Sequence, residues 1–108
     1  MNSDYIPWKI LSATAQVGLL TEGWNLSESP SDPETCRQFT LEIAFASPFS
    51  YPPVIHIGLT GFDIDQNTSP RLSTSVANIT SEGFTIVLTT WQNTLVYSAD
   101  VTWLAVGP

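Results

Sequence analysis

The chain has 108 residues, of which 43% are hydrophobic and 12% are charged. This length predicts one domain that buries roughly 65% of its unfolded surface, and the apolar share excludes a disordered chain. Ten acidic residues stand against three scattered basic ones, a net charge of −7 that makes nucleic acid and anionic membrane surfaces unfavourable partners.

The N-terminal segment, residues 1–8, has an early acidic residue, and no apolar run follows it. It therefore does not predict a signal peptide, and no stretch approaches the ~18 apolar residues of a membrane span. The compartment in which the protein acts stays open. Cys36 is the single cysteine, which excludes a disulfide within the chain and predicts a small buried or semi-exposed thiol. A bridge between subunits is the alternative.

Strand signals dominate the rest of the chain, and helix signals are nearly absent. Eight prolines and many β-branched and aromatic residues predict short strands that are separated by turns. In chain order the expected strands are residues 10–20, 39–45, 54–62, 71–79, 84–91 and 96–106. In residues 96–106 the period of two puts five residues on one apolar face: Tyr97, Ala99, Val101, Trp103 and Ala105. Six strands at regular spacing predict an all-β sandwich.

Two patterns that resemble metal or catalytic sites fail on inspection. Asp63, Asp65 and Asn67 have the first spacings of a calcium loop, but the required Gly and Glu positions are Thr68 and Thr74. A solvated acidic turn is the better interpretation. The single histidine, His56, lies within a strand among apolar residues. One His and one Cys cannot make a zinc site without several carboxylates, and a Ser–His–Asp triad would need this same histidine.

The sequence therefore predicts no metal, no cofactor and no catalytic site. We expect His56 to be a packed or interface residue. A glycosidase would need two facing carboxylates in a cleft, and so short a chain with short loops has little room for one.

An arginine and two aromatic residues are more informative. Trp91 ends one expected strand, Tyr97 begins the next, and Arg71 opens a third. Strand ends lie at the rim of a sandwich, where ligands bind. A sugar needs an apolar wall for its C–H face, which Trp or Tyr offers, and the planar guanidinium of Arg suits adjacent hydroxyls. The alternative is that both aromatic residues pack in the core or in an interface.

Several segments resemble the H-type lectins, the family of the snail agglutinins and of the discoidin C-terminal domain. The matching segments are FASPFSYPPVIHIGLTGFDIDQ, PRLSTSVANITSEGF and TTWQNTLVYSADVTWLAV, in the same order and spacing as in the family. Gln16-Val17 and Gly23-Trp24 resemble the first strand and loop of the family. The match leaves only residues 1–8 outside, so the chain is expected to be a single H-type lectin-like domain over residues 1–108.

The resemblance implies a six-stranded antiparallel β-sandwich that assembles as a homotrimer. Galactose or N-acetylgalactosamine binds between neighbouring subunits in this family. The sugar-binding residues of the family correspond here to Arg71, Trp91, Gln92 and Tyr97, with a carboxylate from the long loop after the first strand that falls on Asp32 or Glu34.

Two departures from the family pattern concern specificity and stability. A snail agglutinin carries His where this chain has Gln92, which leaves the choice between galactose and N-acetylgalactosamine open. The bridging cysteines of the snail proteins are replaced, for example by Leu88, and Cys36 has no clear counterpart. Stability is therefore expected to come from packing and trimer formation.

The resemblance predicts a multivalent, non-enzymatic lectin for glycans with terminal galactose or N-acetylgalactosamine, acting in cell adhesion. An alternative from another class is a structural or adhesive trimeric module, such as a fibre tip, whose sugar site is lost or altered. A small hydrolase is a third, more remote alternative.

Overall fold

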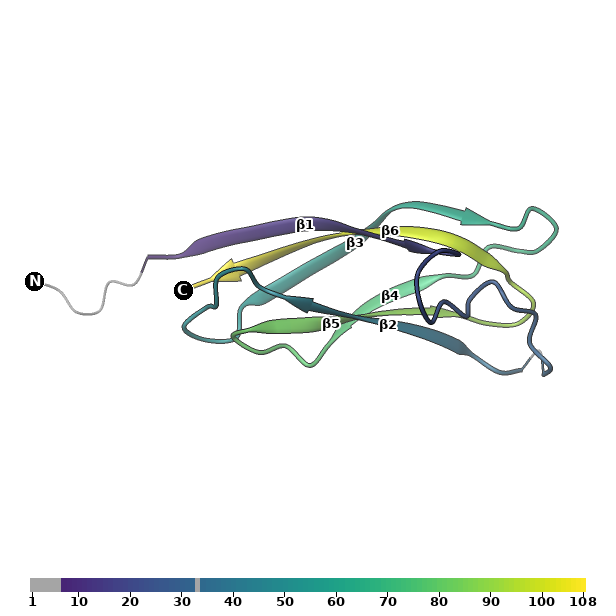
Figure 1. Cartoon of the computed structure of the whole chain (residues 1–108), viewed down its shortest axis with the longest axis horizontal. Coiled ribbons are helices and arrows are strands. Elements are labelled where there is room, and N and C mark those ends of the chain that lie inside the picture. Colours follow the sequence, from purple (N-terminus) through teal and green to yellow (C-terminus); the bar gives the residue numbers. More distant parts are fainter. Residues whose placement is uncertain (1–6, 33) are drawn as a thin grey trace, which may run out of the picture.

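Six strands form two antiparallel sheets that pack face to face (Figure 1). The structure is a computed structural model that describes residues 7–32 and 34–108. Sheet A has the order β1–β6–β3 and sheet B the order β2–β5–β4. This confirms the predicted six-stranded antiparallel β-sandwich. The strands are β1 (Lys9–Gly18), β2 (Arg37–Ala44), β3 (Val54–Ile64), β4 (Ser73–Ala77), β5 (Gly83–Thr90) and β6 (Val96–Gly107).

The core lies between the two central strands, β6 and β5. Alternate residues of β6 point inward, as its period-two pattern predicts: Ala99, Val101, Trp103 and Ala105 are each at most 7% exposed. On β5 the inward residues are Phe84, Ile86 and Leu88. Residues of the outer strands, such as Leu11 and Ile57, pack against this central row. The fold therefore depends on apolar burial from both sheets.

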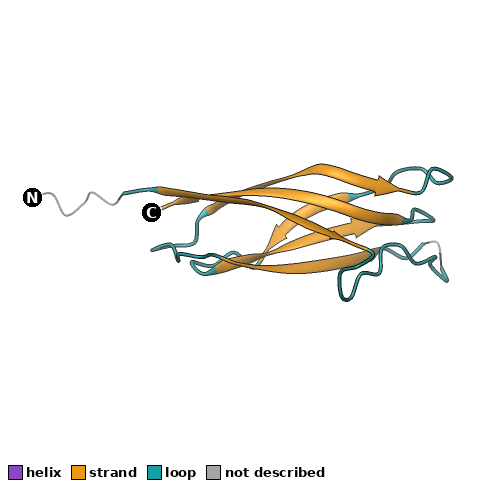
Figure 2. Cartoon of the chain, turned by 45° about the horizontal axis from the view of Figure 1, so that its top comes forward, coloured by secondary structure: helices purple, strands orange, loops and turns teal. Residues whose placement is uncertain are grey.

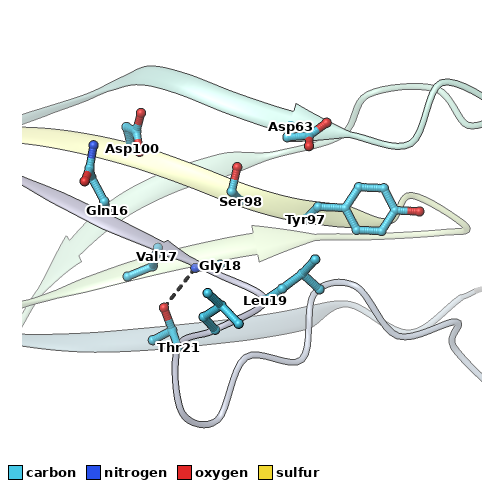
Figure 3. A pocket seen from close by; sticks show the side chains of 10 residues that line it. Gln16, Val17, Gly18, Leu19, Thr21, Asp63, Tyr97, Ser98 and Asp100 are labelled. Atoms are coloured by element: carbon cyan, nitrogen blue, oxygen red, sulfur yellow. Dashed lines mark hydrogen bonds between the residues drawn. The ribbon is translucent and has the colours of Figure 1, made fainter.

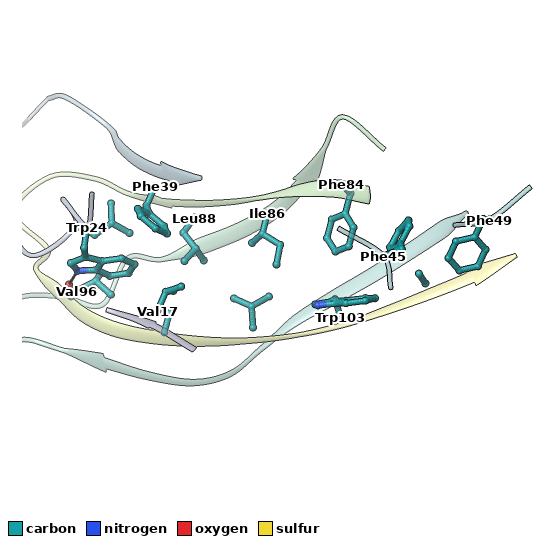
Figure 4. Close-up of a cluster of buried hydrophobic side chains, with 14 residues drawn as sticks. Val17, Trp24, Phe39, Phe45, Phe49, Phe84, Ile86, Leu88, Val96 and Trp103 are labelled. Carbon is teal, nitrogen blue, oxygen red and sulfur yellow. Dashed lines mark hydrogen bonds between the residues drawn. The ribbon is translucent and has the colours of Figure 1, made fainter. Parts of the chain in front are cut away.

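Aromatic side chains close each end of the core (Figure 4). At one end Trp103 packs against Phe45 and Phe84, with ring centroids 5.9 and 5.3 Å apart. At the other end Trp24 packs against Phe39 at 5.0 Å. These separations fall in the favourable range for tilted ring pairs. The second pair draws the long connection after β1 onto the sandwich.

Trp24 also fixes the position of that long connection by a hydrogen bond. Its indole Nε1 donates to the carbonyl oxygen of Val96 at 3.0 Å, and the Val96 amide donates to the Leu26 carbonyl at 2.8 Å. Trp24, Leu26 and Val96 are all buried. The start of β6 and the β1–β2 connection are therefore held together at one end of the molecule.

Most strand boundaries differ from the prediction by one or two residues, and the structure gives a reason for the earlier ends of the first and fourth strands. The first strand ends at Gly18, and Leu20 beyond it is fully exposed. A β-carbon on Gly18 would lie 2.6 Å from the Tyr97 carbonyl oxygen, so only glycine fits there. The fourth strand covers Ser73–Ala77 and is shorter than the expected 71–79. It stops because Asn78, with φ of 53°, leaves the extended conformation.

The predicted N-terminal segment, residues 1–8, falls mostly outside the described residues; of its members, Pro7 and Trp8 are described and exposed. Within residues 7–32 and 34–108, no helix has the length and apolar character that a membrane crossing requires.

Candidate functional site

Antiparallel topology brings all six residues of the predicted site to one end of the sandwich. The connections β1–β2 (19–36), β3–β4 (65–72) and β5–β6 (91–95) leave the sheets at the same end (Figure 2). Tyr97 is the second residue of β6 and lies at that end too. The C-terminus of the chain lies at the opposite end (Figure 1). The predicted residues gathered here are Asp32, Glu34, Arg71, Trp91, Gln92 and Tyr97.

Arg71 is held by the β5–β6 connection. Its Nη1 donates to Asn93 Oδ1 and to Thr94 Oγ1, each at 3.0 Å. Thr94 is fully buried, and its hydroxyl donates to the Ser69 carbonyl at 2.6 Å. The Thr90 hydroxyl donates to the Arg71 carbonyl. One amino group makes both contacts to Asn93 and Thr94, and among the described residues the other, Nη2, forms no hydrogen bond.

Trp91 and Gln92 belong to the same connection. The Thr94 amide donates to the Trp91 carbonyl at 3.4 Å, which closes a tight turn, and the Trp91 side chain stays partly exposed. Gln92 has φ of 56°, a left-handed conformation that is uncommon for a residue other than glycine. Strain of this kind persists only where the surroundings impose it, and it clusters at functional sites. The exposed Gln92 side chain is thus presented by a constrained backbone.

Arg37 holds the backbone of this turn in place through hydrogen bonds to its carbonyls. The sequence alone indicated no role for Arg37. Its Nη2 donates to the carbonyls of Gln92 at 3.0 Å and Thr94 at 2.6 Å. Its Nη1 donates to the carbonyls of Leu26 at 3.3 Å and Glu28 at 2.8 Å. Burial lowers the pKa of Arg37 from its ordinary value. One guanidinium therefore fastens the β1–β2 connection to the β5–β6 connection, and no spacing in the sequence reveals this role.

Tyr97 lies in an irregularity of sheet A. Asp63 pairs with Ser98 and Ile64 pairs with Val96, so Tyr97 has no partner on β3. A bulge of this kind re-aims a side chain. Tyr97 lines an open groove of about 380 Å³ at the end of the sheet (Figure 3).

The groove is lined by both polar and apolar residues. Polar groups come from Gln16, Asp63, Ser98 and Asp100, and exposed apolar side chains come from Leu19 and Leu20, which are 61% and 102% exposed. Partial burial raises the pKa of the Tyr97 phenol above its ordinary value of 10.0, and the carboxylates of Asp65 and Asp63 raise it further. A phenol is already neutral at physiological pH at its ordinary pKa, and the shift moves its titration further from that pH.

Asp32 and Glu34 lie on the long β1–β2 connection and are both exposed. The Glu34 amide donates to Asp32 Oδ1 at 3.0 Å, so Asp32 organises its own turn. Asp32 also lines a depression of about 320 Å³ with Asn25, Glu28 and Arg37. Among the described residues, neither carboxylate forms an ion pair with Arg71.

The single chain thus divides the predicted site into three parts. Arg71 is fixed to the connection that carries Trp91 and Gln92. None of these three residues lines the groove at Tyr97 or the depression at Asp32. The parts share one end of the molecule without forming one pocket within a single chain.

The remaining polar candidates lie elsewhere or form turns. His56 is exposed on the outward face of β3 and is not packed in the chain, which leaves the predicted interface role as a proposal. In the expected acidic turn, the amide of Asn67 donates to Asp65 Oδ1 at 3.0 Å. Among the residues described, no group of three or more His, Cys, Asp or Glu side chains is placed to hold a metal ion. Cys36 is exposed.

Comparison with known proteins identifies the family. The profile of the H-type lectin domain matches residues 40–106, more than half of the chain. The chain therefore belongs to the H-type lectin domain family, as its sequence motifs predicted. A relative from Fuscovulum blasticum, described as ATP synthase subunits region ORF 7, is 37% identical over 71 residues, covering 66% of this chain. The aligned part is 62% of that relative's length.

Solved structures show the same fold. Discoidin II from Dictyostelium discoideum matches 99% of this chain with a TM-score of 0.77 and 22% identity, although this chain spans only 39% of it. A fibre of the R1 pyocin of P. aeruginosa matches 94% of this chain and 23% of its own, with a TM-score of 0.54 and 14% identity. The family supports a carbohydrate-binding lectin fold.

Proposed function

We propose that the protein is a sugar-binding lectin that captures glycans with terminal galactose or N-acetylgalactosamine, without catalysis and without a metal. The single observation that carries the proposal is the geometry of Arg71. Its Nη1 is fixed by Asn93 and Thr94 at 3.0 Å, which leaves the rest of the planar fork for ligand hydroxyls. Membership of a lectin family supports the same function.

Each predicted residue has a distinct role in this proposal. Arg71 donates charge-assisted hydrogen bonds to ring hydroxyls, and Asp32 or Glu34 accepts from them. Trp91 offers an apolar face for the C–H side of the sugar ring. Gln92, exposed on its strained turn, reaches the substituent at the second carbon of the sugar. These contacts resemble a shallow surface site, with a binding free energy of about −4 to −5 kcal/mol for a monosaccharide.

Tyr97 adds a neutral hydroxyl and an aromatic wall, and it lies in a separate groove of the single chain. We therefore propose that the complete site forms between neighbouring copies of a homotrimer. The low share of charged residues, 12%, supports an assembly with extensive contacts. Three sites in one rigid assembly raise apparent affinity on a glycan-coated surface ~10²–10⁴-fold over a single site. Capture of a glycan-coated surface, as in cell adhesion, would follow from this multivalency.

The alternative is a structural or adhesive trimeric module whose sugar site is lost or altered. The pyocin fibre has the same fold, which makes this alternative worth testing. In that case Arg71 only ties the β3–β4 connection to the β5–β6 connection, and no glycan would bind.

A glycan array separates the two functions. The wild-type chain is compared with Arg71→Ala, and trimer mass and circular dichroism are recorded for both. The lectin proposal expects signal on glycans that end in galactose or N-acetylgalactosamine, and loss of that signal in the folded variant. A folded wild-type chain with no signal on any glycan would support the structural alternative. Release of free sugar from a chromogenic galactoside would instead indicate a hydrolase.

A further inference from the structure

The negative charge of the chain gathers at one end of the sandwich, where the connections 19–36, 65–72 and 91–95 meet and the candidate sugar residues lie. We call this the loop end. Six carboxylates belong to it, four on the β1–β2 connection and two around the end of β3: Glu22, Glu28, Asp32, Glu34, Asp63 and Asp65. Against them stand two cations, Arg37 and Arg71. The loop end therefore carries an excess of four negative charges, more than half of the net charge of −7.

Both arginines are engaged with neutral acceptors. The guanidinium of Arg37 donates to the four carbonyls that fasten the β1–β2 and β5–β6 connections together. Arg71 Nη1 donates to the side-chain amide oxygen of Asn93 and to the Thr94 hydroxyl. Among the described residues, no hydrogen bond joins either guanidinium to a carboxylate. The six carboxylates are therefore not neutralised by direct contact with these cations, and their field extends into the solvent around the loop end.

Two hollows of the loop end are each lined by a pair of carboxylates. Asp63 and Asp100 line the groove at Tyr97, and Figure 3 shows them on the neighbouring strands β3 and β6. Glu28 and Asp32 line the depression on the β1–β2 connection, together with Arg37. A cleft that is lined by one sign of charge concentrates the field that a charged ligand meets. A ligand in the groove at Tyr97 therefore meets a negative potential, and the depression also has an excess of one carboxylate.

The ionisation of Tyr97 reports the same potential at a predicted sugar residue. Burial is the largest cause that raises the pKa of its phenol, and the carboxylates of Asp65 and Asp63 raise this pKa further. These carboxylates disfavour a negative charge on the Tyr97 oxygen because like charges repel. An anionic group of a ligand that is placed beside Tyr97 would meet the same repulsion.

We propose that the sugar site selects its ligands by charge. It accepts galactosides that are neutral or carry an amine, and it rejects galactosides that carry a sulfate or a carboxylate beside the ring. This inference rests on the proposed lectin function and names the class of glycan that the site takes. Like charges that face each other suppress binding, whereas an ammonium group is attracted by the same carboxylates. The sign of the selection is set by the six carboxylates of the loop end together, and no single one of them is required.

Arg71 is the group of the loop end that most favours an anion, and the sugar itself occupies it. In the proposed site its remaining donors bind ring hydroxyls, so an anionic substituent is left to face the carboxylates. A guanidinium stabilises an anion mainly at hydrogen-bonding distance. Repulsion by the carboxylates acts over the screening length, which is about 10 Å at about 0.1 M salt. The excess of carboxylates therefore outweighs Arg71 for a substituent that does not contact it.

The test uses three galactosides that differ only in charge. Each has a propyl group on the anomeric oxygen that ends in a carboxylate, a hydroxyl or an ammonium group, and the three N-acetylgalactosamine counterparts are measured beside them. Competition against a glycan-coated surface gives their affinities for the full chain at neutral pH. We expect the ammonium form to bind about tenfold more tightly than the carboxylate form at about 0.1 M salt, with the hydroxyl form between them. At about 1 M salt, where the screening length is ~3 Å, the three affinities should agree within about twofold.

Two matched double variants assign the effect to the loop end. Glu22→Gln with Glu28→Gln removes two exposed carboxylates of the loop end that are not predicted sugar residues. Glu42→Gln with Glu82→Gln removes the same charge outside the loop end, and an amide oxygen at position 42 can still accept the hydrogen bond from Thr85. The first pair is expected to reduce the preference for the ammonium form about two- to threefold, with the affinity for the hydroxyl form unchanged. The control pair should keep the wild-type preference, and circular dichroism establishes that both proteins are folded.

The outcomes separate this inference from the function on which it rests. Equal affinities of the three galactosides at about 0.1 M salt, or tighter binding of the carboxylate form, would overturn selection by charge while leaving the lectin function intact. An equal loss of preference in the two double variants would overturn the assignment to the loop end. If wild type binds neither the three galactosides nor their N-acetylgalactosamine counterparts, the lectin function fails and this inference fails with it.

Discussion

Arg37 and Gln92 are joined across the loop end of the sandwich by a hydrogen bond from the Arg37 guanidinium to the Gln92 carbonyl, 3.0 Å long. Gln92 at the same time holds φ of 56°. The first residue of β2 thus holds in place the turn that presents a candidate specificity residue. We propose that Arg37 contributes to the candidate site through the position of this backbone, without contact to the sugar.

Replacing Arg37 by Met is expected to lower the free energy of unfolding by ~2–4 kcal/mol. The change removes hydrogen bonds to four carbonyls, two on each connection. It leaves the part-buried Thr94 carbonyl without this donor, whereas the Leu26 carbonyl keeps the Val96 amide. Arg37→Lys is expected to recover only part of the loss, because an ammonium group cannot span the same acceptors. Urea unfolding measures both variants. Wild-type stability in Arg37→Met would show that the two connections are held by other contacts.

Replacing Gln92 by Gly is expected to raise stability by ~0.5–1 kcal/mol. Glycine adopts a positive φ without the steric cost that a β-carbon incurs, and this gain exceeds its greater entropy loss on folding. Gln92→Ala keeps the β-carbon and is the control, expected to give no gain. Thermal unfolding distinguishes them. Equal stability of the Gly and Ala variants would argue against strain at this turn.

Gln92→His tests specificity at the same position. The proposed contact lies at the second carbon of the sugar, where galactose and N-acetylgalactosamine differ. The relative affinity for these two sugars is expected to change by ~1 kcal/mol, with the fold intact. Competition by each free sugar on a glycan-coated surface measures the ratio. An unchanged ratio would place the substituent away from Gln92.

The free energy of unfolding at alkaline pH is expected to depend on the Tyr97 phenol. Partial burial and the carboxylates of Asp65 and Asp63 raise its pKa above 10.0 in the folded chain, so folding favours the protonated phenol. The stabilisation is fully present below the unfolded pKa and is lost as pH rises through the folded pKa. Tyr97 therefore contributes no pH dependence from about pH 7 to about pH 9. Urea unfolding at a series of alkaline pH values measures the effect. Tyr97→Phe should lack this loss of stability at alkaline pH, and an identical loss in both proteins would contradict the prediction.

The fold was predictable from local pattern. The apolar period of two in residues 96–106 gives the inward face of β6, and Pro and Gly mark most of the turns. The shortened fourth strand was missed because a single left-handed residue, Asn78, ends it and no pattern announces that conformation. Antiparallel pairing then determines which connections share an end, so the six predicted site residues lie at the same end of the sandwich.

The architecture of the site was less predictable. Arg37 looked like one of three scattered cations, because its role depends on four carbonyls from two connections that are distant in sequence. The bulge at Tyr97 depends on the register between β3 and β6, which alternation alone does not fix. Both features arise from non-local packing, and both decide how the predicted residues are presented.

The most direct measurement is a calorimetric titration of wild type and Arg71→Ala with galactose and with N-acetylgalactosamine, at trimer masses verified for both proteins. Arg71 Nη1 is held at 3.0 Å by Asn93 and Thr94, and we propose that its remaining donors bind the sugar. Wild type is expected to bind one of the two sugars in the millimolar range, with one site per chain. Removing the guanidinium is expected to cost ~2–4 kcal/mol, which abolishes detectable binding. Undiminished binding by folded, trimeric Arg71→Ala would show that the sugar site lies elsewhere.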